Sequence, residues 1–532
     1  MTATEGKEGN PVNKKRNIHI FVILFIMLLS PADNGVIAAT NAQPVDSTLP
    51  DHFGRMFHLP PFAPPTDDIR AALLEVGKPG GILDAKDNLV AGPKNLIVDP
   101  SLSANNRNNP TQTAGTTFFG QFLDHDMSFD LTSTLGTTTP PITSVNTRTP
   151  AFDLDSVYGE GPAGSPQLYD PNDPIKFRVE TGGLFEDLPR DPATKVAIIA
   201  DPRNDENLNL AGLHAAFLLF HNKAVDLVRS TTPSISNQNA FAEARRLTTY
   251  HYQWMILYEY LPLIVGQAMV DDILTNGRWF YTPWDGQAFI PVEFQIAYRF
   301  GHSMVRPSYR ANLAGDNGNA FFGMIFDPAG EGSPDPIDLR GFARAPRRYI
   351  DWQTFFDFGD GEVKPNKRID TKISTPLFHL PLPTIPSNAP PTSLMQRNLL
   401  RHLTWSIPSG QTIARFMGVP VLKASKFADI AQIHSSFAIS TPLLFYILRE
   451  AEQPGVDGLH LGAVGGRIVG EVFIGLLESD PNSFLNADPF WEPTLQANTG
   501  ITNNFCHSKF CMTDFLSFAG VDPACRHQNI CR

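Results

Sequence analysis

The segment LNLAGLHAAFLLFHNKAVDLVRS, residues 208–230, determines the fold class of this chain. Its apolar side chains recur three or four positions apart, at Leu213, Phe217, Phe220, Ala224 and Leu227. Residues at that spacing share one face of an α-helix, and an apolar face packs against other parts of the protein. The spacing therefore predicts a long helix in the interior of a helical domain.

The same spacing recurs along the chain, whereas strand-like alternation is scarce. It is found at residues 240–265, 291–305, 396–405, 409–417, 437–450 and 461–477, and Pro291 suits the first turn of its helix. No repeat and no linker rich in proline and glycine divides the chain. We therefore predict a mainly α fold, with a single large helical domain and long irregular loops at residues 118–500. An irregular N-terminal arm at 43–117 precedes this domain, and a cysteine-rich tail at 501–532 follows it.

The chain has 532 residues and a formal net charge of −12, so a broad basic surface for nucleic acid is not expected. The N-terminus follows a different pattern. Lys14, Lys15 and Arg16 precede an apolar run at residues 18–29 that is too short to span a bilayer comfortably. This pattern is typical of a secretory signal peptide, which we place within residues 1–42. The prediction is a secreted, extracellular protein without stable membrane association after cleavage. The alternative is a protein anchored in the membrane through residues 18–29.

All four cysteines lie near the C-terminus, at Cys506, Cys511, Cys525 and Cys531. An even number of clustered cysteines in an exported chain predicts two disulfides, although the spacing does not give their connectivity. A zinc site with His507 and His527 is the alternative, but the spacings fit no common zinc finger.

The segment FGQFLDHDMSFD, residues 119–130, places a histidine between two aspartates at the end of an aromatic run. On a helix, Gln121 lies on the same face as Asp124 and His125, which are three and four positions further on. Asp126 points elsewhere. We therefore expect the two aspartates to have different roles.

Two more polar groups accompany predicted helices. Arg203 and Glu206 are three positions apart in ADPRNDENLNL, where helix capping is the alternative explanation. His302 lies in AYRFGHSMVRP, where a buried structural histidine is the alternative. Gly301 beside it favours the close approach of a flat group, because a glycine inside a helix costs about 1 kcal/mol.

Haem chemistry with peroxide gives these residues a common purpose. The iron needs one neutral imidazole ligand, which is held through its other ring nitrogen. The opposite face needs a base that moves a proton from peroxide to the leaving oxygen, and a cation that stabilises the developing charge. Two histidines and one arginine from distant helices meet these needs.

The motifs GQFLDHD, SVYG, Arg203-x-x-Glu206, RFGH and Asn398-x-x-Arg401 occur in this order along the chain. In this combination the sequence resembles the animal-type haem peroxidases of the peroxidase–cyclooxygenase superfamily, from about residue 50 to about residue 520. The segments KRIDTKISTPLF and RHLTWSIPSGQ are most similar to secreted bacterial members.

The resemblance implies roles on the two faces of a haem. His125 is similar to the distal catalytic base, Arg203 to its charged partner, and Gln121 to the glutamine that orders water and halide above the iron. His302 is similar to the proximal iron ligand, and Asn398 is expected to accept a hydrogen bond from its other ring nitrogen.

The resemblance also implies how haem b is attached. Asp124 and Glu206 match the carboxylates that form ester links to the haem, and Arg299 and Arg401 match arginines near its propionates. Asn207 stands where some members have a methionine bonded to the haem, so a third link is not expected.

Asp126 matches a ligand of Ca²⁺ that ties the distal helix to an acidic loop. The other ligands implied by the resemblance are Thr149, Ala151 through its carbonyl, Asp153 and Asp155. Carboxylate and carbonyl oxygens suit this hard cation. Without the resemblance, we would interpret Asp153 and Asp155 as part of a solvent-exposed loop.

The implied function is that of a secreted haem peroxidase. It uses hydrogen peroxide to oxidise halide, pseudohalide or small aromatic donors through an oxoferryl intermediate. A fatty-acid dioxygenase of the same superfamily is disfavoured, because Arg299 occupies the position of its radical tyrosine and Tyr298 lies on another helix face. An adhesion or matrix protein on the same fold is the other alternative, although no RGD or KGD tripeptide occurs. His214 and His221 are interpreted as structural. The sequence specifies neither the electron donor nor the oligomeric state.

Overall fold

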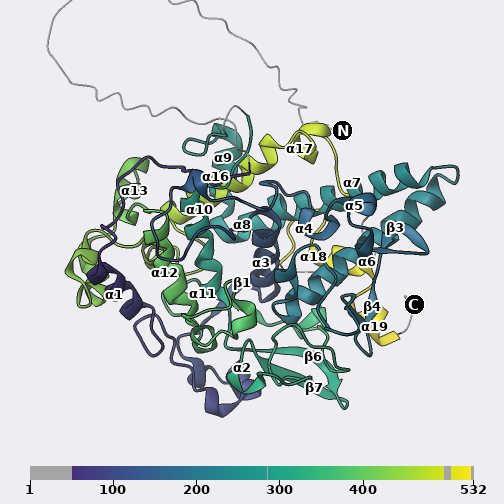
Figure 1. Ribbon diagram of the computed structural model, residues 1–532, viewed down its shortest axis with the longest axis horizontal. Coiled ribbons are helices and arrows are strands. Elements are labelled where there is room, and N and C mark those ends of the chain that lie inside the picture. Colours follow the sequence, from purple (N-terminus) through teal and green to yellow (C-terminus); the bar gives the residue numbers. More distant parts are fainter. Residues whose placement is uncertain (1–50, 284–285, 496–504, 529–532) are drawn as a thin grey trace, which may run out of the picture. The chain divides into compact units, whose positions relative to one another are not determined.

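The long helix predicted at residues 208–230 is α6, Leu208–Thr231, in the centre of the fold (Figure 1). The structure, a computed structural model, describes residues 51–283, 286–495 and 505–528. Asn207 caps α6, because its side chain accepts a hydrogen bond from the Leu210 amide at 3.1 Å. The helix packs against α3 (Gly115–Met127), α7 (Asn237–Met255) and α18 (Met512–Ala519).

Helices dominate the described residues, which confirms the mainly α prediction. The remaining α-helices are α1 (Asp67–Val76), α2 (Pro93–Val98), α4 (Asp155–Tyr158), α5 (Gly161–Gly164), α8 (Leu261–Val265), α9 (Gln267–Asn276), α10 (Val292–Ala297), α11 (Gly301–Met304), α12 (Leu394–Thr404), α13 (Gly410–Met417), α14 (Ala428–Ala431), α15 (Leu443–Ala451), α16 (Ala463–Ser479), α17 (Phe484–Ala487) and α19 (Pro523–Gln528). Several short 3-10 turns connect them, among them η5 (Pro202–Asp205) and η7 (Tyr298–Phe300).

The described strands form only antiparallel pairs. The pairs are β1 (Asn108–Thr113) with β8 (Pro365–Lys367), β2 (Tyr169–Asp170) with β3 (Asp173–Phe177), β4 (Glu180–Thr181) with β5 (Glu186–Asp187), and β6 (Ser308–Asp316) with β7 (Asn319–Met324). From Ser47 onward the chain forms one unit, consistent with a single large helical domain.

Local chemistry interrupts several helices that the spacing predicted as continuous. The segment 240–265 changes to a π-turn at Ile256–Tyr260, just before Pro262, whose missing amide cannot continue an α-helical ladder. The segment 291–305 contains the 3-10 turn η7 between α10 and α11. In the arm that was predicted to be irregular, α1 and α2 are helical.

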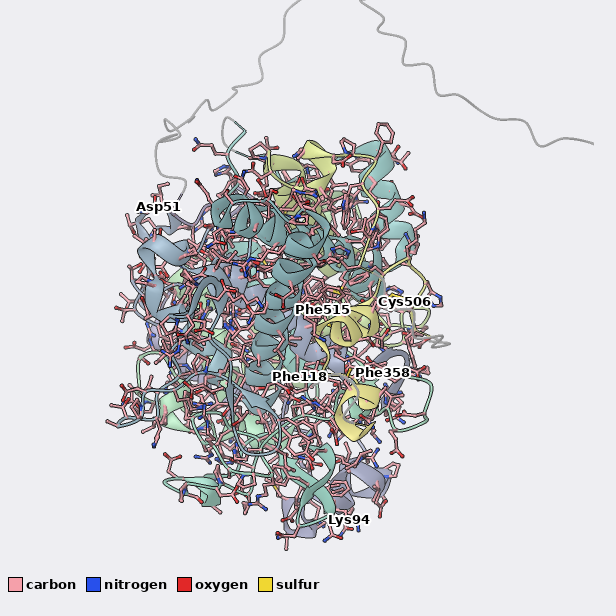
Figure 2. The ribbon with its side chains drawn as sticks, turned by 90° about the vertical axis from the view of Figure 1, so that its right-hand side faces the viewer. Asp51, Lys94, Phe118, Phe358, Cys506 and Phe515 are labelled. Atoms are coloured by element: carbon pink, nitrogen blue, oxygen red, sulfur yellow. A yellow bond between two sulfur atoms is a disulfide. The ribbon has the colours of Figure 1, made fainter. Side chains whose placement is uncertain are left out.

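Stacked aromatic rings join three helices in the core. Phe122 of α3 stacks on Phe217 of α6, with ring centroids 4.6 Å apart and planes 2° apart. The ring of Phe515 on α18 (Figure 2) packs against two rings of α6. Its centroid lies 4.4 Å from that of Phe217 and 4.5 Å from that of Phe220. The C-terminal segment is therefore part of the core that supports α3.

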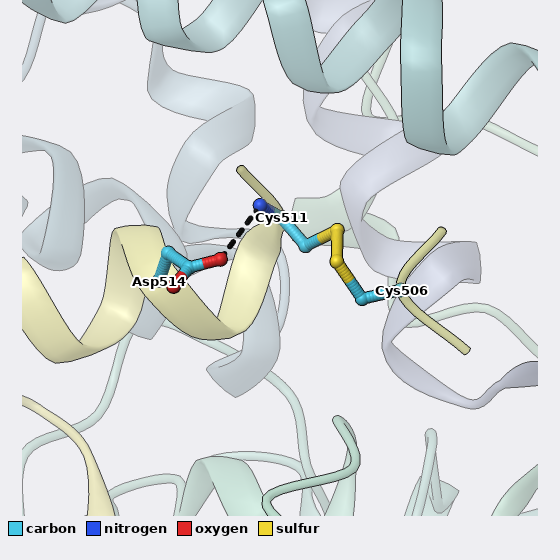
Figure 3. Close-up of side chains that lie close together, drawn as sticks. All are labelled: Cys506, Cys511 and Asp514. Atoms are coloured by element: carbon cyan, nitrogen blue, oxygen red, sulfur yellow. Dashed lines mark hydrogen bonds between the residues drawn. A yellow bond between two sulfur atoms is a disulfide. The ribbon is translucent and has the colours of Figure 1, made fainter. Parts of the chain in front are cut away.

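The predicted disulfides are confirmed in part. Cys506 and Cys511 are joined, and the Cys511 amide donates a hydrogen bond to the Asp514 carboxylate at 3.0 Å (Figure 3). Cys525 is also disulfide-bonded, whereas Cys531 lies outside the described residues.

The predicted signal peptide and its apolar run at 18–29 also lie outside the described residues. Within the described part of the chain, no helix combines the length and apolar character needed to cross a membrane.

Candidate active site

A cavity of about 680 Å³ lies between helices that are far apart in the sequence. Its size falls within the range of ligand-binding pockets, about 300–1,000 Å³. All nine residues that the resemblance assigns to a haem pocket line it: Gln121, Asp124, His125, Arg203, Glu206, Arg299, His302, Asn398 and Arg401. The structure therefore brings together side chains from α3, η5, η7, α11 and α12.

His125 lies near the C-terminal end of α3 and is 4% exposed. Its Nδ1 is 2.9 Å from the side-chain oxygen of Asn204, which can only accept, so Nδ1 carries the proton and donates. Burial, with the Arg203 charge adding to it, lowers the pKa of His125 to about 3. The ring is therefore neutral, with an unprotonated Nε2. No pattern in the sequence pointed to Asn204, which is interpreted there as an ordinary capping residue.

Arg203 is held by two groups beside the cavity. Asp201 caps η5 and accepts from the Arg203 guanidinium at 3.0 and 2.8 Å, and a further bond of 2.9 Å reaches the His125 carbonyl. The guanidinium also lies over the Phe129 ring, 3.8 Å from its centroid. Although burial alone would raise the pKa of Asp201, Arg203 lowers it to about 2, so this is a charged pair. Sequence reasoning missed Asp201.

Two carboxyl groups, Asp124 and Glu206, face the same cavity. Burial raises the pKa of both, that of Glu206 to about 8. Gln121 donates to Glu206 at 3.2 Å, and Asn207 in turn donates to the Gln121 oxygen at 3.2 Å. Asn207 thereby turns the amide nitrogen of Gln121 toward Glu206.

His302 contacts Asn398 as predicted, but the direction of the hydrogen bond is the reverse of the prediction. The amide nitrogen of Asn398, not its oxygen, lies 2.7 Å from Nδ1 of His302. The oxygen accepts from Arg299 at 3.0 Å. A guanidinium only donates hydrogen bonds, so Arg299 must bond to the oxygen of the Asn398 amide. The nitrogen of that amide therefore faces the His302 ring.

The remaining predicted residues of the cavity have defined partners. Arg401 forms an ion pair with Asp130 at 2.7 Å and lies over the Trp405 ring, with 5.1 Å to its centroid. A side chain added at Gly301 would meet no atom within 4 Å, so this position opens onto free space in the cavity wall. The approach of a flat group to Gly301 stays a prediction.

Two tyrosines that the sequence analysis did not assign to the site also line the cavity. The hydroxyl of Tyr298 is 2.7 Å from that of Tyr260 and donates to the Gly120 carbonyl at 3.0 Å. A Cβ added at Gly120 would lie 2.3 Å from the Tyr260 hydroxyl, which explains the glycine in GQFLDHD. The sequence placed Tyr298 on a helix face away from Arg299. The 3-10 turn brings both residues to the cavity wall.

An acidic cluster lies behind α3. Carboxylate oxygens of Asp126, Asp153 and Asp155 all lie within 4.8 Å of one another. Burial and mutual repulsion raise the pKa of Asp126 well above its usual value and that of Asp153 to about 6. Three carboxylates at this distance, one buried and two partly buried, fit a divalent cation with oxygen ligands.

Thr149 and Ala151 lie in the loop beside this cluster. The Thr149 hydroxyl donates to Asp155 at 3.3 Å, and the buried Ala151 donates its amide to the Thr149 carbonyl at 2.8 Å. Asp126 also accepts from the hydroxyls of Ser156 at 2.8 Å and Tyr252 at 3.0 Å, which the sequence analysis did not predict. The cluster therefore joins α3 to the acidic loop and to α7.

Comparison with known proteins shows which family the chain resembles. A sequence model described as "Animal haem peroxidase" matches residues 131–321. Peroxidase mlt-7 of Caenorhabditis elegans is 27% identical over 57% of this chain and 40% of its own length. Human eosinophil peroxidase is 28% identical over 28% of this chain and 22% of its own length. The chain thus matches less than half of each of these relatives.

Solved structures support the fold. Peroxidase A from Dictyostelium discoideum has a TM-score of 0.54 at 16% identity, over 76% of this chain and 87% of its own. The Oryza sativa fatty acid alpha-dioxygenase also has a TM-score of 0.54, at 13% identity, over 88% of this chain and 78% of its own. At these identities the likeness concerns the fold alone. The family match and the sequence relatives confirm the resemblance to animal haem peroxidases that is seen in the motifs.

Proposed function

We propose that this protein is a secreted haem peroxidase that uses hydrogen peroxide to oxidise halide, pseudohalide or small aromatic donors. The observation that carries the proposal is one cavity with a neutral histidine on each of two distant helices, the buried His125 on α3 and the partly buried His302 on α11. Arg203 adds a fixed positive charge beside His125. This set meets the needs of peroxide chemistry at a haem.

His302, Arg299, Arg401, Asp124 and Glu206 would hold the haem. The open space at Gly301 and the size of the cavity fit a flat macrocycle. When bound, the haem supplies the iron that accepts oxygen from peroxide and returns to its ferric form at the expense of a donor. Asp124 and Glu206 line the cavity with carboxyl groups whose pKa is raised by burial, that of Glu206 to about 8, and they would form its ester links.

His125 moves the proton in this proposal. Its free Nε2 takes a proton from one oxygen of hydrogen peroxide and delivers it to the other, which leaves as water. Arg203 stabilises the negative charge that develops as the O–O bond breaks. Gln121, Asn207 and Arg203, whose side chains carry N–H donors, line the same cavity, which would suit small anionic donors.

Asp126, Asp153 and Asp155, with Thr149 and the Ala151 carbonyl, would bind Ca²⁺. Asp126 follows His125 directly in the chain, so a cation bound there would fix the position of α3 from behind.

The pH dependence follows from the buried state of His125. A base with a pKa of about 3 stays unprotonated through the neutral range and titrates only in acid. We therefore expect the second-order rate constant for reaction with peroxide to be constant between about pH 5 and pH 8. Stopped-flow measurements across this range test it, and a fall as the pH drops from 8 to 6 would contradict it.

Asn398 is expected to control haem retention. Coordination through Nε2 of His302 requires a proton on Nδ1, and hence the Asn398 oxygen, not its nitrogen, as the partner. Asn398→Leu should weaken haem affinity about 10- to 100-fold, whereas Asn398→Asp, which presents only acceptors, should retain it. Haem titration followed by absorbance measures both. Equal affinity in the leucine variant and the wild type would exclude this role.

The first experiment is the absorption spectrum of the purified protein before and after extraction with acid acetone. A Soret band that stays with the protein supports haem and its ester links, and halide oxidation is then assayed. A band that moves into the solvent argues against the esters. Oxygen uptake with linoleate in the absence of peroxide would favour the dioxygenase alternative. The absence of a Soret band from protein made in haem-replete cells would overturn the proposal.

A further inference from the structure

A fully buried amide lies between two histidines at the edge of the cavity. Asn204 is 0% exposed and belongs to the same turn, η5, as Arg203. Its oxygen is 2.9 Å from Nδ1 of His125, and its nitrogen is 3.0 Å from Nδ1 of His214 on α6. Both ends of the amide are therefore paired, and each partner is a ring nitrogen.

The chemistry of the amide fixes the protonation of both rings. A carbonyl oxygen only accepts, so Nδ1 of His125 must carry a proton. An amide nitrogen only donates, so Nδ1 of His214 must be bare and its proton must be on Nε2. The two neutral histidines are thus held as opposite tautomers by one side chain.

We propose that Asn204 and His214 are positioning residues that select the tautomer and ring orientation in which His125 presents a bare Nε2 to the cavity. The inference rests on the proposed function for its kinetic consequence, but not for its structural one. In the other tautomer, Nε2 carries a hydrogen and the ring cannot take a proton from a peroxide or from any other acid. A base that spends part of its time in that tautomer is correspondingly slower.

The backbone and the neighbouring helix hold the amide in place. The Asn204 amide N–H donates to the Asp201 carbonyl at 3.1 Å, so the turn that fixes Arg203 also fixes Asn204. His214 is 1% exposed, and its ring meets the Phe122 ring edge-on, with centroids 6.5 Å apart. Phe122 and His125 lie on the same helix, so His214 contacts α3 both directly and through Asn204. The structural role expected for His214 thus includes a contribution to the site.

Three variants and one control separate positioning from folding. Asn204→Leu removes both bonds at nearly constant volume. Asn204→Asp keeps an acceptor for Nδ1 of His125 but has no donor for His214. His214→Leu leaves the Asn204 nitrogen without its acceptor, so the amide is free to turn. Asn222→Leu is the control, because Asn222 on α6 also uses both ends of its amide, to the Phe177 backbone at 2.7 and 2.9 Å, and does not line the cavity.

The first readout is independent of haem and of activity. In the full chain without haem, selective ¹⁵N labelling of histidine distinguishes a protonated from a bare ring nitrogen, and a His125→Gln sample assigns the signal. We expect a protonated Nδ1 at His125 in the wild type, in Asn204→Asp and in the control. Asn204→Leu should give a mixture of tautomers. A wild-type His125 with its proton on Nε2 would overturn the inference, whatever the protein catalyses.

The second readout uses the haem-bound protein and two acids, hydrogen cyanide and hydrogen peroxide. Both must lose a proton to the base, so the association rate constants should fall together, about tenfold in Asn204→Leu, where both the tautomer and the ring orientation are lost, and by a smaller factor in His214→Leu. Asn204→Asp should restore most of the rate, and the control should be unchanged. Equal rates in Asn204→Leu and the wild type would overturn the inference. A chain that binds no haem would instead count against the proposed function and leave the tautomer result standing.

Discussion

Replacing His125 by leucine is expected to lower the rate constant for reaction with hydrogen peroxide by about 10³-fold, while the Soret band is retained. A positioned general base contributes about 10²–10⁴-fold to such a reaction, and Nε2 of His125 makes no hydrogen bond within the described residues that would compete. Arg203 remains in place, held by Asp201, and accounts for the residual rate. Stopped-flow absorbance after mixing with peroxide measures the change.

A second buried histidine provides the control for this experiment. His221 on α6 is 0% exposed and bonds Tyr158 at 2.9 Å and the Ile175 carbonyl at 3.0 Å, away from the cavity. His221→Gln should reduce thermal stability and leave the peroxide reaction within about threefold of the wild type. If His125→Leu reacts as fast as His221→Gln, the base is another group.

Removing Ca²⁺ with a chelator is expected to destabilise the protein by about 3–4 kcal/mol at neutral pH, as for a ligand present at several hundred times its Kd. The acidic cluster then holds three carboxylates within 4.8 Å of one another. Thermal unfolding with calcium and with EGTA measures the difference. An unfolding temperature insensitive to EGTA, Ca²⁺ and Mg²⁺ would contradict a cation site.

In the cation-free protein, the stability of the fold is expected to decrease as the pH rises. The pKa of Asp153 rises on folding to about 6, from an ordinary value of 3.8, because of burial first and Asp155 second. Between these values the folded state binds more protons than the unfolded state, so stability falls as the pH rises from about 4 to about 6. With EGTA present, the unfolding temperature should therefore be higher at pH 5 than at pH 7.5.

Asp153→Asn provides a matched test, because it removes one charge and keeps the shape of the side chain. With EGTA at pH 7.5 the variant should be more stable than the wild type, since two carboxylates repel less than three. With calcium it should be less stable, because a ligand is lost. The same rank order in both buffers would show that Asp153 acts only through packing.

Sequence alone predicted the helices whose apolar spacing is long and regular, and α6 is the best example. It failed where a single residue decides the local path, as at Pro262, where the predicted helix changes to a π-turn. The nine residues of the cavity could be named because their motifs match those of a family, and the fold then brings them to one place.

The polar contacts between these residues could not be predicted. Asn204 and Asp201 act through bonds to side chains that the sequence does not place near them in space. The orientation of the Asn398 amide depends on competition with Arg299, and that competition appears only in three dimensions. Contacts set by donor and acceptor geometry have no periodic signature in a sequence.

The contacts among the rings of Phe122, Phe217 and Phe515 have a consequence for the order in which the protein folds. Phe515 follows Phe217 and Phe220 at a long distance in the sequence, so the ribosome delivers it well after them. Until Phe515 is in place, the rings of Phe217 and Phe220 are not covered by it. The helix α3, which carries His125 and packs on Phe217 through Phe122, then lacks part of its supporting core. Domains generally fold as units, and an exposed apolar layer favours incomplete, aggregation-prone states. We therefore expect a cofactor to bind only after α18 has packed, and a variant truncated before α18 to bind it poorly.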